Sequence, residues 1–135
     1  MKRISATVAL AALIAAVPGA ASAQSALEGH WKNAKGSLVV KVAPCGTTWC
    51  GIVVDATEKA KAGARRGGTA NLIGTRILTG VRPAGDDVYK GQAFDAKRNI
   101  HVPATIRVLG PSTLSVKGCV LGGLICKEQR WTRVS

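Results

Sequence analysis

The segment from Ile100 to Val108 constrains the fold of this chain more than any other stretch, because apolar residues occupy every second position. Ile100, Val102, Ala104, Ile106 and Val108 alternate with mostly polar side chains. This pattern is typical of an antiparallel strand with one buried face. Further strand-like runs, separated by turn-forming residues, occur at 37–43, 49–55, 88–95, 113–117 and 124–134.

This spacing of short strands and turns predicts an all-β domain, either a sandwich or a barrel. Most of the strands follow one another as consecutive hairpins. A small antiparallel up-and-down barrel is preferred, because closing the sheet leaves no strand edge exposed. We expect seven or eight strands and no helix outside the N-terminal segment.

The N-terminus has the features of a secretory signal peptide. Lys2 and Arg3 precede the apolar run Ile4–Val17, and Ala21-Ser22-Ala23 supplies the small residues that a signal peptidase requires. We expect residues 1–23 to be cleaved and residues 24–135 to form a single domain. Because no second long apolar stretch follows, the mature chain is expected to lack a transmembrane segment and to be periplasmic or secreted.

The four cysteines agree with an oxidising compartment. Three pairings are available to them. Cys45 and Cys50 enclose turn-like residues, as do Cys119 and Cys126, so we favour two local bridges over long-range pairing. A zinc site is the weaker alternative, because neither spacing matches the short gap of a structural zinc site.

The chain is strongly basic, with a formal net charge of +12 that falls by two when Lys2 and Arg3 are removed. In a cytosolic protein this charge would suggest nucleic acid. For an exported chain we expect no nucleic-acid partner. An anionic component of the cell envelope is the corresponding expectation, because clustered positive charge attracts anions. The alternative is that the charge only keeps the protein soluble.

A basic segment, Lys59–Gly68, separates two of the expected strands. It contains Lys and Arg among Ala and Gly, with no bulky apolar side chain to bury. A short helix over residues 56–64 is one interpretation, but the glycines favour a mobile loop. The loop would be either a basic flap over an anionic ligand or a solvated connection.

The sequence lacks the usual signatures of catalysis. Hydrolase, zinc-protease and phosphate-binding-loop motifs do not occur. His30 and His101 have no clear carboxylate partner, and oxidised cysteines would supply no thiolate. We therefore expect no catalytic group, cofactor or metal; a small hydrolase that depends on His101 is the least favoured hypothesis.

Gly29-His30-Trp31 resembles the first strand of lipocalins, which carries a Gly-x-Trp. The resemblance implies that the Trp plugs one end of the barrel and that a basic side chain from the last strand lies across it. Arg133, or Arg130, is the residue in the position to do this. We interpret Trp31 and Trp131 as barrel-closing residues.

A narrower resemblance covers nearly all of residues 29–134. The chain is similar to a family of small exported bacterial proteins that is classed as a domain of unknown function with a lipocalin-like barrel. The similarity rests on these segments: 29–31, 44–46, 50–53, 74–80, 94–95, 116–119 and 131–133. The chain departs from the family pattern at the basic segment Lys59–Gly68 and at the hairpin 95–101, which has no Gly and no Tyr.

These features lead to a functional hypothesis and an alternative. The first is an exported protein that binds a small apolar or amphipathic ligand, including an anionic one. In it Ile100, Val102 and Ile106 line a pocket, and Trp49 is a further ligand contact. The alternative is a protein- or polymer-interaction module of the cell envelope. Its barrel is filled by those aliphatic side chains, and its surface uses Trp49 and the basic segment.

Overall fold

The computed structural model describes residues 9, 11 and 25–135. The predicted signal peptide, residues 1–23, lies outside the described residues apart from positions 9 and 11. Within the described part of the chain, no helix has the length and apolar character needed to cross a membrane.

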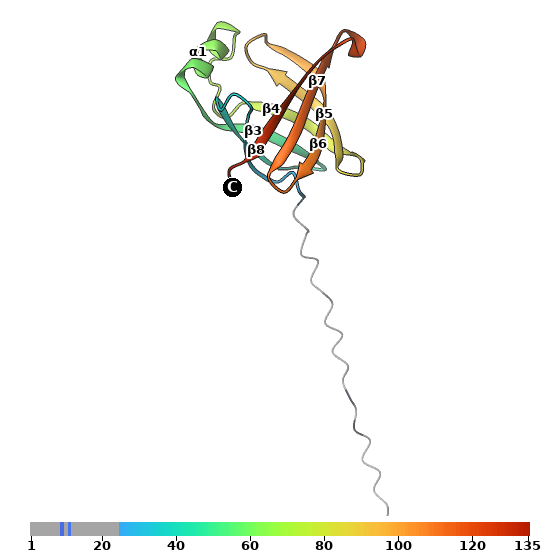
Figure 1. The fold of residues 1–135 in the computed structure, drawn as a ribbon. Coiled ribbons are helices and arrows are strands. Elements are labelled where there is room, and N and C mark those ends of the chain that lie inside the picture. The colour runs from blue at the N-terminus through green and yellow to red at the C-terminus, as the bar shows by residue number, and fades with distance from the viewer. Residues whose placement is uncertain (1–8, 10, 12–24) are drawn as a thin grey trace, which may run out of the picture.

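Eight strands form a closed antiparallel barrel in which each strand pairs with its neighbours in sequence, and β8 returns to β1 (Figure 1). The all-β up-and-down barrel expected from the sequence is thus confirmed, with eight strands. The elements are β1 (Gly29–Lys32), β2 (Leu38–Cys45), β3 (Thr48–Ala56), α1 (Glu58–Arg66), β4 (Arg76–Gly85), β5 (Val88–Asp95), β6 (Ile100–Gly110), β7 (Thr113–Val120), the short 3-10 turn η1 (Leu121–Gly123) and β8 (Ile125–Arg133).

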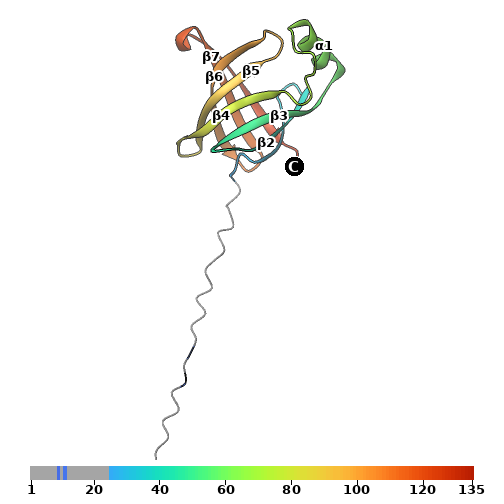
Figure 2. The ribbon, with the colours of Figure 1, turned by 180° about the vertical axis from the view of Figure 1, so that it is seen from behind.

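The connections alternate between the two ends of the barrel because consecutive strands run antiparallel. We call the closed end the one where residues 25–28, the β2–β3, β4–β5 and β6–β7 turns and the C-terminus meet. The open end carries the β1–β2 turn, α1, the β5–β6 turn and the β7–β8 turn. Figures 1 and 2 show α1 and the β7–β8 turn at the end opposite to the C-terminus.

The core fills the barrel next to the closed end and extends on one side to Ala64 and Leu72 beneath α1. Inward-facing side chains from most strands pack there, in agreement with the period of two along a strand. The largest fully buried side chains are Trp31, Leu27, Leu78, Ile106, Leu114, Val40, Val53 and Val81. Ile106 is only 2% exposed, so it belongs to the packed core and does not line an empty chamber.

The seam between β8 and β1 is short. β8 pairs with β7 from Thr113–Thr132 to Val120–Ile125. Its other edge pairs with β1 only at Trp31–Arg133 and Lys32–Thr132. The segment 125–130 of β8 is exposed throughout, so the barrel wall is incomplete on this side towards the open end.

The basic segment is a helix and not the mobile loop that the sequence favoured. α1 begins after Thr57, whose hydroxyl accepts a hydrogen bond from Ala60 N, and Lys61 pairs with Glu58 at 3.1 Å. Ala64 is 1% exposed and packs in the core cluster. The prediction failed because the buried face of α1 consists of small residues, which give little hydrophobic signal.

Both disulfides are local, which confirms the pairing predicted from the spacing. Cys45 joins Cys50 across the β2–β3 turn, and Cys119 joins Cys126 across the β7–β8 turn. No cysteine is free, so the zinc alternative for these residues falls away. Two disulfides favour an extracellular or periplasmic environment.

Candidate binding site at the open end of the barrel

The closed end is sealed by Trp31 and Arg133. The Trp31 indole is fully buried and donates from Nε1 to Leu27 O at 2.8 Å. The Arg133 guanidinium lies 4.3 Å from the centroid of the Trp31 ring. It also donates to Pro111 O at 2.8 Å, to Glu28 O at 2.6 Å and to Ala26 O at 2.8 Å. Trp31 and Arg133 thus occupy this end of the barrel.

Gly29 provides the space for this arrangement. A Cβ placed on Gly29 would overlap Arg133 Nη1, and the glycine has a φ of +139°. The glycine of the Gly-x-Trp pattern is thus explained by the close approach of the guanidinium. Of the two candidate arginines, the structure places Arg133 across Trp31, whereas Arg130 is exposed on β8.

The other two tryptophans also lie towards the closed end. Trp131 is 4% exposed, and its Nε1 donates to Gln129 Oε1 at 3.0 Å. Trp49 packs edge-on against Tyr89, with 5.7 Å between ring centroids, and both rings contact the core. The Trp49 Nε1 is buried without a protein partner. Trp49 therefore lies away from the open end, where the candidate site is found.

Helix α1 covers one side of the open end. Ala64 and Leu72 are almost completely buried. A Cβ on Gly67 would overlap the carbonyl oxygens of Ala96 and Lys97, so the end of the helix rests directly on the β5–β6 turn. This contact requires glycine and closes the α1 side of the barrel mouth.

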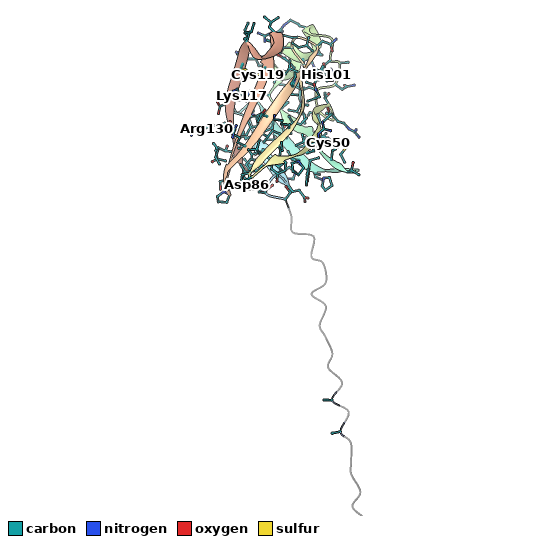
Figure 3. All side chains as sticks on the ribbon, turned by 90° about the vertical axis from the view of Figure 1, so that its right-hand side faces the viewer. Cys50, Asp86, His101, Lys117, Cys119 and Arg130 are labelled. Carbon is teal, nitrogen blue, oxygen red and sulfur yellow. A yellow bond between two sulfur atoms is a disulfide. The ribbon has the colours of Figure 1, made fainter. Side chains whose placement is uncertain are left out.

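The opposite side of the mouth remains uncovered and contains a solvent-open groove of about 590 Å³. Residues 100–103 at the start of β6 form one wall, and residues 119–123 form the other. Ile100, Val102, Val120 and Leu121 provide aliphatic side chains to it. Figure 3 shows His101 and Cys119 at this end of the barrel and Asp86 at the other.

The groove arises where β6 and β7 part. Their pairing runs from Gly110–Thr113 to Ala104–Gly118, whereas β6 remains paired with β5 as far as Ile100. A Cβ on Gly118 would lie 3.2 Å from Val102 Cγ2. The Val102 side chain thus lies over Gly118. Because glycine has no side chain, β7 adds none to the inner wall at this position.

A lysine lies on the inner face next to this glycine. Lys127 is opposite Gly118 in the β7–β8 register, and directly opposed residues of an antiparallel pair point to the same side of the sheet. It is an even number of residues from the buried Trp131, which is consistent with that facing. Lys127 is exposed, and it follows Cys126, whose disulfide partner Cys119 lines the groove.

The sequence-predicted ligand contacts are therefore divided. Ile100 and Val102 line the groove, Ile106 is core, and Trp49 lies near the closed end. Sequence reasoning missed Val120, Leu121 and Lys127. Counting back from Trp131 in steps of two would have placed Lys127 on the inner face.

Comparisons with known proteins agree with this architecture. Residues 29–133 match the family described as "Uncharacterized protein conserved in bacteria (DUF2147)". No curated protein matches the chain in sequence. Among solved structures, the chain is similar to protein HP1028 from the human pathogen Helicobacter pylori, which is described as belonging to the lipocalin family. The identity is 15%, the TM-score is 0.64, and the match covers 81% of this chain and 83% of that chain. At this identity the likeness shows the fold alone.

Proposed function

The chain belongs to the DUF2147 family of bacterial proteins, and we propose that it is an exported binding protein for a small amphipathic molecule with an anionic head. A lipocalin-like barrel fits small-ligand binding in general. The proposal includes no catalytic group and no cofactor.

The observation that carries the proposal is the aliphatic groove at the open end with Lys127 beside it. Its volume of about 590 Å³ lies within the usual range for small-molecule sites, about 300–1,000 Å³. Because the closed half of the barrel is filled, the proposed ligand lies at the mouth and does not reach the barrel floor. Its apolar part would contact Ile100, Val102, Val120 and Leu121.

The charges around the mouth support an anionic head. Basic residues at this end include Arg65, Arg66, Lys97, Arg98 and Lys127. Four acids lie towards the same end, Asp55, Glu58, Asp95 and Glu128, and two of them are paired. Glu58 pairs with Lys61 at 3.1 Å, and Asp95 pairs with Arg98 at 3.7 Å. A surplus of positive charge at an opening raises the local concentration of anions.

The filled core also favours the alternative, a protein- or polymer-interaction module with no internal ligand. In that case the groove would remain empty and small amphiphiles would not bind. The two functions therefore differ in whether the barrel takes up a small molecule.

Native mass spectrometry of the protein recovered from its natural compartment is the first test. We expect a bound species of discrete mass. Dodecanoate and dodecanol, titrated into the stripped protein, then separate the contribution of the head from that of the chain. We expect dodecanoate to bind more tightly and to raise the thermal midpoint.

Two matched pairs of variants locate the site. Lys127→Ala should weaken dodecanoate binding about three- to tenfold with little effect on dodecanol, whereas Lys117→Ala on the outer face of β7 should change neither. Ile100→Glu should weaken both ligands, and Val54→Glu is its control because both native side chains are 39% exposed. The interaction module would be favoured if the recovered protein carries no amphiphile and binds neither added one. It would also be favoured if the two variants of each pair have equal effects.

A further inference from the structure

Large aliphatic side chains are exposed together at the tip of the β7–β8 hairpin. Leu121 is 68% exposed, Leu124 85% and Ile125 55%. We call residues 121–125 the tip loop. We propose that the tip loop docks the barrel on an anionic lipid bilayer. Residues 121–123 also line the groove, whereas Leu124 and Ile125 do not, so substitutions at Leu124 and Ile125 separate this role from small-ligand binding.

The exposure of these side chains is built into the hairpin. The Cys119–Cys126 disulfide closes its base, and Val120 pairs with Ile125 immediately before the turn. Within the turn, Leu124 N donates to Leu121 O at 3.3 Å, and Leu121, Gly122 and Gly123 all have positive φ. A loop this short and this constrained holds Leu124 and Ile125 away from the barrel.

The surroundings of the tip loop are basic, which complements an anionic surface. Lys117 and Lys127 belong to the same hairpin, and Lys97 lies in the next turn around the open end. Glu128 is the one acid of this hairpin, so its lysines and arginines leave a net positive charge. Apolar insertion combined with basic flanks is the usual basis of peripheral membrane binding.

The shape of the loop favours a bilayer over a protein partner. The hairpin tip protrudes from the open end (Figures 1 and 2), and the side chains it carries there are aliphatic. Protein interfaces are instead enriched in aromatic residues and arginine at their centres. A protruding aliphatic loop matches a soft apolar medium that adapts to it. The docked orientation also places the groove at the bilayer surface.

Vesicle co-sedimentation of the exported protein tests the proposal. Vesicles of phosphatidylglycerol and phosphatidylcholine are compared with vesicles of phosphatidylcholine alone. We expect strong binding to the anionic vesicles only. Binding should weaken when the salt is raised from about 0.1 M to about 1 M, because the Debye length falls from about 10 Å to about 3 Å.

The decisive variant is Leu124→Ser combined with Ile125→Ser. We expect its partitioning to fall at least about tenfold, as the transfer free energies of aliphatic side chains imply. Leu109→Ser combined with Val54→Ser is the matched control. These side chains are 49% and 39% exposed and lie outside the tip loop. The control should bind vesicles like the unmodified protein.

The proposal is wrong if the tip-loop variant binds vesicles as well as its control, or if neither vesicle type binds the protein at low salt. It is also wrong if the tip-loop substitutions abolish self-association in sedimentation velocity while vesicle binding persists, which would identify a second copy as the partner.

Dodecanoate binding is measured separately without vesicles. Loss of vesicle binding with retained dodecanoate binding therefore leaves the proposed function intact, and the reverse result leaves the docking surface intact.

Discussion

The guanidinium of Arg133 lies 4.3 Å above the centre of the Trp31 ring and joins the last strand of the barrel to the first. Its donors reach three backbone carbonyls, two of them in residues 26–28 before β1 and one in the β6–β7 turn. The Arg133 side chain thus connects residues 26–28, the β6–β7 turn and Trp31.

Replacing Arg133 is expected to destabilise the barrel. Arg133→Ala removes the cation–π contact and leaves carbonyl groups without their donor, so we expect a loss of about 2–4 kcal/mol in the free energy of unfolding. Chemical denaturation measures it. Arg130→Ala is the control, because Arg130 is exposed, and it should cost less than about 0.5 kcal/mol. A double-mutant cycle with Trp31→Phe should show coupling between Arg133 and Trp31; strictly additive effects would contradict the stacking.

Gly29→Ala is expected to displace Arg133. The added methyl group would overlap the guanidinium, and its backbone φ of +139° is unfavourable for alanine. We expect a loss of about 2 kcal/mol or more in unfolding free energy. Gly46→Ala is the control for the backbone cost alone, because Gly46 has a φ of +71° and nothing lies within 4 Å of the added Cβ; we expect about 1 kcal/mol there. In the Arg133→Ala background, the cost of Gly29→Ala should shrink.

The two disulfides should contribute unequally. Chain entropy assigns about 2–3 kcal/mol to each such short loop. Cys50 is 5% exposed, whereas Cys126 is exposed. Replacing the Cys45–Cys50 pair by serines should therefore cost more than replacing Cys119–Cys126, because it also buries a hydroxyl group. Thermal unfolding of both double variants measures the difference, and equal midpoints would argue against it.

Helix α1 should depend on its small buried face. Ala64→Gln places a polar side chain where alanine is 1% exposed, and we expect a loss of about 1–3 kcal/mol in stability. Lys59→Gln changes an exposed residue of the same helix and should be nearly neutral. Hydrogen exchange should show faster amide exchange over Glu58–Arg66 in Ala64→Gln only. Equal exchange in both variants would indicate that the helix is not anchored by Ala64.

Individual residues show how much of the candidate site could be predicted from the sequence. The alternation from Ile100 to Val108 predicted β6 and its inward face, and the same rule applied to β8 would have assigned Lys127. Sequence could not distinguish the filled half of the barrel from its mouth. Ile100, Val102 and Ile106 share one strand face, yet of these three only Ile106 is buried in the core. Depth along a barrel depends on the register of neighbouring strands, which alternation does not encode.

By itself the sequence determined the barrel, its consecutive hairpins and the local disulfides, because these follow from period-two patterning and short-range geometry. Only the tertiary structure decided that Arg133 and not Arg130 covers Trp31, that residues 58–66 form a helix, and that β6 and β7 part beyond Ala104–Gly118. Each of these depends on contacts between segments far apart in the chain. Gly67 is glycine because the carbonyl groups of Ala96 and Lys97 approach it, and no local pattern in the sequence reports that contact.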